Sequence, residues 1–144
     1  MKIKRFIQEQ EDYTIISKET PLISNLNILE NISLIKEVHE FMPTTAAENI
    51  AKQHLKKAAL LDIAYKRPIN CTNSELLSVM LLRAMMCKSH TIIISNPIDL
   101  LNNLKDIKDI IRDIKDMPDE KNIIILDLLS NEIHYEGCSC HTIR

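Results

Sequence analysis

One glycine, Gly137, occurs among the 144 residues of this chain, and it lies close to the carboxyl end. A loop that wraps a phosphate needs consecutive backbone N–H groups with no Cβ in the way. The P-loop motif therefore requires two glycines, and the dinucleotide-binding motif Gly-x-Gly-x-x-Gly requires three. Neither motif can be written with this sequence, so these two ways of holding a nucleotide are excluded.

Composition predicts one α/β domain over residues 1–144, because 45% hydrophobic residues in a chain of this length can bury one core. A net charge of -2, with 3% aromatic residues, argues against a nucleic-acid surface. No apolar run approaches the roughly 18 residues that span a bilayer. Without a signal sequence, the four cysteines are expected to be free thiols in the cytoplasm.

The most informative stretch runs from Cys71 to Asp99. Thr72 and Glu75 are spaced as a capping box, in which a hydroxyl and a carboxylate each satisfy a backbone donor at the start of a helix. A helix is predicted over 73–87, followed by a β-branched strand over 91–95 that is buried on both faces. Asn96-Pro97 is predicted to end that strand.

Further elements follow from the spacing of apolar residues and from turn signals. Thr45 to Glu48 is a second capping-box sequence, and Ser130-Asn131 is predicted to be a hairpin turn before an edge strand. The remaining predicted elements are helices over 27–41, 45–63 and 99–116, and strands over 13–17, 122–128 and 132–136.

The succession of helix, strand and Asn-Pro resembles the second half of the nucleotide-binding domain of ABC transporters. The phrase Leu81-Leu82-Arg83-Ala84-Met85 resembles the end of that family's signature helix, and Leu26 to Ile32 resembles the phrase after its Q-loop. The resemblance implies an incomplete P-loop NTPase core without the Walker A lobe, which would precede Met1. It also implies a helical subdomain (26–70), the second half of the core (71–136) and a tail (137–144).

The motifs of the family are altered in this chain. Cys71 to Glu75 stands where the signature Leu-Ser-Gly-Gly-Glu is expected, and both glycines are absent. Ser95 and Asn96 occupy the Walker B positions of the metal-binding Asp and the catalytic Glu. The Q-loop glutamine is absent near Lys18 or Glu19, and the switch histidine is absent at Asp127 or Leu128. Because serine and asparagine are not ionised near neutral pH, hydrolysis on this chain is not expected.

Two interpretations of the segment Thr72, Asn73, Ser74 and Glu75 stay open. It could be the remnant of a signature loop that contributes, in trans, to ATP and magnesium held mainly by a partner, because a helix N-terminus suits an anion. It could instead only cap its own helix, which is the commoner use of this pattern and the preferred interpretation. No other cofactor is expected.

Cys138, Cys140 and His141 place three soft ligands in four residues, which invites zinc. A tetrahedral site needs a fourth ligand, for which His134 is the nearest candidate. A flexible, oxidation-prone tail is the preferred alternative, and no metal is expected.

These observations predict a non-catalytic ABC transporter ATPase-like subunit or accessory protein in the bacterial cytoplasm. Its partner would be a permease, bound through Leu26 to Ile63 at the inner face of the membrane, or an ATPase subunit, or a second copy. One alternative is an ATP-binding subunit that contributes a signature-like loop to a partner's site. Another is a free-standing small α/β protein of unrelated role, because fold-level likeness does not confer function.

Overall fold

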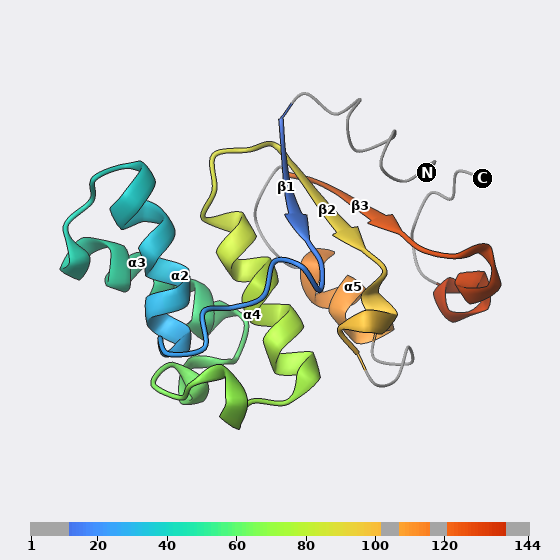
Figure 1. The fold of residues 1–144 in the computed structure, drawn as a ribbon, viewed down its shortest axis with the longest axis horizontal. Coiled ribbons are helices and arrows are strands. Elements are labelled where there is room, and N and C mark those ends of the chain that lie inside the picture. The colour runs from blue at the N-terminus through green and yellow to red at the C-terminus, as the bar shows by residue number, and fades with distance from the viewer. Residues whose placement is uncertain (1–11, 102–106, 116–120, 138–144) are drawn as a thin grey trace.

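Three parallel strands form the sheet at the centre of the molecule. The structure is a computed structural model that describes residues 12–101, 107–115 and 121–137. The strands β1 (Tyr13–Ile16), β2 (Thr91–Ser95) and β3 (Asn122–Leu126) lie in the order β1-β2-β3. In their register, Ile16 lies opposite Ile94, and Ile94 lies opposite Ile125. The predicted α/β class is therefore confirmed (Figure 1).

The helices are arranged unevenly around this sheet. The helices α2 and α3 lie together on the β1 side, α4 lies between them and the strands, and β3 lies at the opposite end (Figure 1). The α-helices are α2 (Ile28–His39), α3 (Thr44–Lys57), α4 (Asn73–Met85) and α5 (Ile107–Lys115). Short 3-10 helices are η1 (Leu61–Ile63), η2 (Pro68–Asn70), η3 (Pro97–Asp99) and η5 (Leu129–Tyr135).

One apolar core joins the helices to the sheet. Ile92, Ile93 and Ile94 of β2 are fully buried, as the β-branched run predicted for a strand covered on both faces. Ile92 and Ile94 belong to a core cluster that also holds residues of α2, α4 and α5, among them Ile32 and Ile107. The central strand is therefore shielded by elements from both halves of the chain.

The start of α2 is stabilised by two asparagines in the family-like phrase. Asn27 forms a capping box with Glu30: its side-chain oxygen accepts from the Glu30 N–H at 2.7 Å, and its own N–H donates to the Glu30 carboxylate at 3.1 Å. The buried Asn31 amide accepts from the Ile23 N–H at 2.7 Å and donates to three backbone carbonyls. These bonds hold the loop before α2 against the helix.

Among the described residues, three that carry a Cβ adopt positive φ angles, where glycine is the usual choice: Phe41 (52°), Ala59 (58°) and Asn96 (50°). Ala59 completes a Schellman motif at the end of α3, in which Leu60 N–H donates to Leu55 O at 2.8 Å and Ala59 N–H donates to Lys56 O at 3.1 Å. A nearly glycine-free chain therefore makes its tight helix ends with larger residues.

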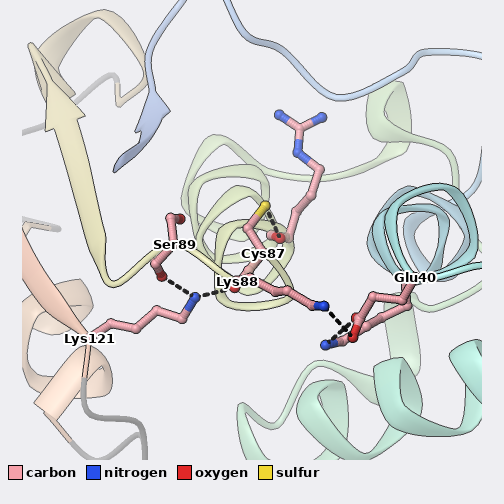
Figure 2. Close-up of polar contacts among 7 residues, drawn as sticks. Glu40, Cys87, Lys88, Ser89 and Lys121 are labelled. Carbon is pink, nitrogen blue, oxygen red and sulfur yellow. Dashed lines mark hydrogen bonds and ion pairs between the residues drawn. The ribbon is translucent and has the colours of Figure 1, made fainter. Parts of the chain in front are cut away.

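Lys121, just before β3, connects that strand to the end of α4. Its ammonium group donates to the carbonyls of Cys87 and Ser89, the latter at 2.7 Å (Figure 2). A cation beside the last carbonyls of a helix also complements the helix dipole. Next to it, Lys88 forms a 3.8 Å ion pair with Glu40 at the end of α2.

The predicted edge strand over 132–136 is wrong, because residues 132–135 belong to the 3-10 helix η5 and Glu136 is its C-cap. Asp127 explains the difference. Its carboxylate accepts from the Leu128 N–H at 2.7 Å, the Asn131 amide at 2.8 Å and the Tyr135 hydroxyl at 2.6 Å. These bonds hold the chain in a 3-10 helix after β3, so Ser130-Asn131 is not a hairpin turn.

The predicted helix over 45–63 is too long and its proposed cap is wrong. The helix α3 begins at Thr44 after Pro43, which makes no side-chain cap, so Thr45 is already inside the helix. It ends at Lys57, because the left-handed backbone at Ala59 turns the chain away.

The predicted helix over 99–116 is also divided. Pro97 opens η3 after the left-handed Asn96, and α5 covers Ile107–Lys115, while 102–106 and 116 lie outside the described residues. The other predicted elements end early: the helices 27–41 and 73–87 stop at His39 and Met85, and the strands 13–17 and 122–128 stop at Ile16 and Leu126.

Candidate functional site at the carboxyl end of the sheet

The carboxyl ends of the three strands point to one edge of the sheet, which is where open α/β sheets bind ligands. The residues that follow β1, β2 and β3 at this edge include Ser17, Asn96 and Asp127. The chemistry available there depends on which polar groups remain free of the chain's own hydrogen bonds.

At the start of α4 the capping-box prediction is confirmed. The Thr72 hydroxyl accepts from the Glu75 N–H at 3.1 Å, and the Thr72 N–H donates to the Glu75 carboxylate at 2.8 Å. Both polar side chains therefore serve their own helix. A role of Thr72, Asn73, Ser74 and Glu75 toward a nucleotide stays a prediction.

The end of β2 carries neutral groups in a tight turn. Ser95 is buried, and Asn96 adopts a left-handed backbone whose N–H donates to Leu126 O at 2.8 Å. The Asn96 carbonyl accepts from the Asp99 N–H at 3.0 Å, which closes η3. Asparagine tolerates this conformation because its side chain is short and polar. The turn thus accounts for the residue type at 96 without a ligand.

The end of β3 is occupied by Asp127, the residue near which the switch histidine of an ABC domain would fall. Both of its carboxylate oxygens accept hydrogen bonds from within η5, including that from Tyr135 at 2.6 Å. This carboxylate therefore serves to hold η5 in place.

The end of β1 is joined to α4 by Arg83, whose importance to this site the sequence did not reveal. Its guanidinium donates to the carbonyls of Thr20 at 2.7 Å and Pro21 at 3.1 Å. Burial lowers the pKa of Arg83 from its ordinary value. The Thr20 hydroxyl in turn accepts from the Ser17 N–H at 3.1 Å. The arginine in the family-like phrase thus fixes the segment where a Q-loop would lie.

A cavity of about 260 Å³ lies between that segment, α4 and η3. Its wall is mostly apolar, with Leu22 and Leu77 among the lining residues and one charge of each sign, Lys18 and Asp99. Asn73 is the member of the signature-like segment that lines it, whereas Ser95 and Asn96 do not. The start of α4 and the segment after β2 therefore line the same cavity. Most residues predicted for the site are not among its lining residues: Thr72, Ser74, Glu75, Ser95 and Asn96.

The described residues hold no group of three or more His, Cys, Asp or Glu side chains that could bind a metal ion. The predicted weak zinc ligands Cys138, Cys140 and His141 lie outside the described residues. The described thiols of Cys71 and Cys87 are free. Burial, and next the carboxylate of Glu75, raise the pKa of the Cys71 thiol. Among the described helices, none has the length and apolar character to cross a membrane.

Comparison with known proteins identifies a fold. No protein-family model and no curated protein matches the sequence. Among solved structures, the chain is similar to the ATP-binding cassette MJ0796, seen as a dimer in a post-hydrolysis state bound to ADP and Pi, with a TM-score of 0.63 and 20% sequence identity. The similarity covers 91% of this chain, which spans 58% of the length of the other. The fold is therefore that of part of an ABC-type P-loop NTPase core with its helices.

Proposed function

We propose that this chain is a non-catalytic ABC transporter ATPase-like subunit or accessory protein that pairs with a transporter ATPase or permease. The observation that carries the proposal is the side-chain chemistry at the carboxyl ends of β2 and β3, within an ABC-like fold. Ser95 and Asn96 are neutral, and the Asp127 carboxylate is held by three hydrogen bonds of its own segment. Magnesium prefers carboxylate oxygens, and an attacking water needs a base, so this edge is poorly equipped for hydrolysis.

The helical pair α2 and α3 supports a role in binding a partner. Between these helices, Phe41 is 90% exposed and has a φ angle of 52°. The N–H groups of Glu40 and Met42 both donate to Lys36 O, which fixes the turn. A bulky residue at positive φ costs free energy, and a ring left in water gains no hydrophobic stabilisation to offset that cost. Such a side chain is better explained by contact with another protein.

In this proposal the helical pair docks on a permease or ATPase subunit at the cytoplasmic face of the membrane. Val38, on the last turn of α2, is a second exposed apolar side chain in this pair, at 57% exposed. The chain would bind and position its partner, and any ATP would be held mainly by that partner. The interpretation of Thr72 and Glu75 as a loop acting in trans belongs to this same arrangement.

Nucleotide binding tests the non-catalytic part of the proposal. Titration calorimetry with magnesium and ATP, together with a phosphate-release assay, is expected to give neither heat nor product with the purified chain. Steady release of phosphate that persists through repurification would contradict the proposal. Heat only in the presence of a partner would indicate a composite site, and loss of that heat in Thr72→Ala would assign the contribution to α4.

Partner binding is tested by two glycine substitutions that change the backbone alike. Phe41→Gly and Ala59→Gly both place glycine at a left-handed, exposed position, but the first removes an aromatic ring and the second only a methyl group. Co-purification with a co-expressed ABC permease and a co-expressed ABC ATPase subunit should weaken in Phe41→Gly and stay at the wild-type level in Ala59→Gly. If neither subunit binds the wild-type chain, the free-standing alternative is favoured.

A further inference from the structure

The segment between the end of α3 and the start of α4 gathers positive charge. Residues 56–70, which we call the basic segment, carry one acidic residue and four cations in a chain whose net charge is -2. The acidic residue is Asp62, and the cations are Lys56, Lys57, Lys66 and Arg67, all of them exposed. Charge is therefore unevenly distributed over the molecule, and this surface suits an anionic partner.

The four cations are available to such a partner. In the part of the chain that the structure describes, none of their side chains forms an ion pair or donates a hydrogen bond. Other cations are engaged within the chain: Lys36 and Lys88 with Glu40, Arg112 with Asp109, Arg83 with the carbonyls of Thr20 and Pro21, and Lys121 with those of Cys87 and Ser89. The basic segment therefore holds charge that the described fold does not use.

Exposed apolar side chains lie among these charges. Leu61 is 44% exposed, Tyr65 is 71% exposed and Ile69 is 89% exposed. An aliphatic side chain as exposed as Ile69 stands almost clear of the protein surface. Apolar side chains that project between Lys and Arg match the interfacial region of a bilayer, where tyrosine rings and the stems of basic residues lie between water and acyl chains.

The backbone of the basic segment is held against the start of α2. Ala64 O accepts from the Leu29 N–H and Lys66 O accepts from the Ile28 N–H, both at 2.9 Å. Ile63 and Ala64 are buried, and η1 packs against α3. Figure 1 shows the green segment after α3 beside the start of α2. Because these contacts fix the backbone, less conformational entropy is lost when the outward side chains bind a surface.

We propose that the basic segment binds the surface of an anionic lipid bilayer. The four cations lie against the lipid phosphate groups, and the side chains of Tyr65 and Ile69 enter the boundary between headgroups and acyl chains. Reversible attachment of this kind combines electrostatic attraction with the burial of apolar area. The chain would therefore lie on a membrane through residues of its own.

Charge and apolar exposure together favour a bilayer over a nucleic acid. A single-stranded nucleic acid is held by phosphate contacts and by stacking of bases on aromatic rings. The basic segment offers one such ring, Tyr65. Leu61 and Ile69 are aliphatic and gain free energy by leaving water, which the acyl region of a bilayer permits.

This contact is separate from the partner-docking surface at Phe41. The basic segment lies at the start of α2, whereas Phe41 follows the end of that helix. At roughly 1.5 Å per residue, the helix separates the two places by about 18 Å. Phe41→Gly should therefore keep membrane binding, so that failure of one proposal leaves the other standing.

Cosedimentation with lipid vesicles tests the proposal on the full chain. Binding is expected to vesicles that contain phosphatidylglycerol, and not to vesicles of phosphatidylcholine alone. It should fall as NaCl is raised, because salt screens the attraction between the cations and the lipid phosphates. Equal binding to both kinds of vesicle would overturn the proposal. Absence of binding to either kind at low salt would also overturn it and would favour an acidic protein as the partner.

Matched double variants locate the contact. Lys66→Gln/Arg67→Gln should weaken binding about 30-fold, since each cation near an anionic bilayer contributes about fivefold. Lys88→Gln/Arg112→Gln removes the same charge at exposed positions elsewhere and should weaken binding less than about threefold. Equal losses in the two variants, with wild-type circular dichroism, would mean that net charge alone drives binding and that the basic segment is not the contact.

Tryptophan substitution tests insertion directly, because the chain contains no tryptophan. The emission of Ile69→Trp should shift to shorter wavelength when anionic vesicles are added, as the indole ring leaves water. Leu129→Trp makes the same type of change in η5, at a side chain that is 71% exposed, and should show no shift. A shift of both variants, or of neither, would contradict insertion through the basic segment.

Discussion

In this protein, residues with a Cβ occupy left-handed backbone positions that glycine usually fills. At Ala59 and Phe41 the backbone turns left-handed after a helix, and both residues keep a Cβ that this conformation disfavours. Each position is held by backbone hydrogen bonds to the preceding helix, such as that from Leu60 to Leu55. The local geometry is therefore set by the helix end, and the residue type carries a cost in stability.

Ala59→Gly should stabilise the protein by about 0.5–1 kcal/mol, because relief of the left-handed alanine outweighs the larger entropy of glycine in the unfolded chain. Urea unfolding would measure the change as a shift in midpoint at constant slope. Alanine substitution of a neighbouring exposed residue, Lys57→Ala, serves as the control and should stay within about 0.5 kcal/mol of wild type. A destabilised Ala59→Gly protein would mean that the left-handed turn is not maintained in solution.

Arg83→Met should destabilise the protein by about 2 kcal/mol, since it keeps the aliphatic bulk but leaves the carbonyls of Thr20 and Pro21 without their donor. Thermal unfolding by circular dichroism is the measurement. Arg83→Lys retains one charge and should lose less, because an ammonium group cannot reproduce the fork that reaches two carbonyls. Equal stability of Arg83→Met and wild type would show that this junction is not a stabilising contact.

At the scale of the elements, the start of α4 agrees with the capping box in its sequence. Thr72→Ala should lower the free energy of unfolding by about 1 kcal/mol by removing the N-cap acceptor. Thr45→Ala is the matched control, because Thr45 stands in a similar sequence but lies within α3 and makes no cap. Its effect should be within about 0.5 kcal/mol. Similar losses in both variants would contradict the assignment of the cap to Thr72 alone.

Local signals predicted the elements that depend on local chemistry. The β-branched run at Thr91 to Ile94 indicated a buried strand, and the Thr72 spacing indicated the start of α4; both are confirmed. The helix ends were less predictable. The chain turns at Ala59 because Leu60 and Ala59 bond back to the helix, and alanine itself carries no stop signal.

Long-range contacts explain what the sequence could not predict at the candidate site. Asp127 binds Tyr135, eight residues away, and coils a segment whose alternation resembled a strand. Arg83 reaches carbonyls 62 and 63 residues away, so its role appears only in the fold. The cavity beside α4 likewise combines segments that are distant in sequence, and its charged residues Lys18 and Asp99 follow no recognisable spacing.

At the scale of the whole molecule, the core predicts a single unfolding transition. One cluster includes Ile28 of α2, Leu81 of α4 and Ile92 of β2, so the helical pair and the sheet share buried surface. Unfolding followed by helix content and by tyrosine fluorescence should therefore give coincident curves. A separate, earlier loss of helix signal would show that α2 and α3 unfold independently, and the shared core would then contribute little to their stability.

The parallel pairing of β1 with β2 also joins two strands that are synthesised at well-separated times. Tyr13 pairs with Thr91, 78 residues later by subtraction of their numbers. At synthesis rates of roughly 5–20 residues per second, β1 leaves the ribosome on the order of 4–16 s before its neighbour exists. The strand β1 therefore waits for β2, its partner in the described sheet, during the synthesis of about half of the chain. Conditions that slow translation between these two strands should lengthen the time during which a nascent chain displays Ile15 and Ile16 to chaperones and to other chains.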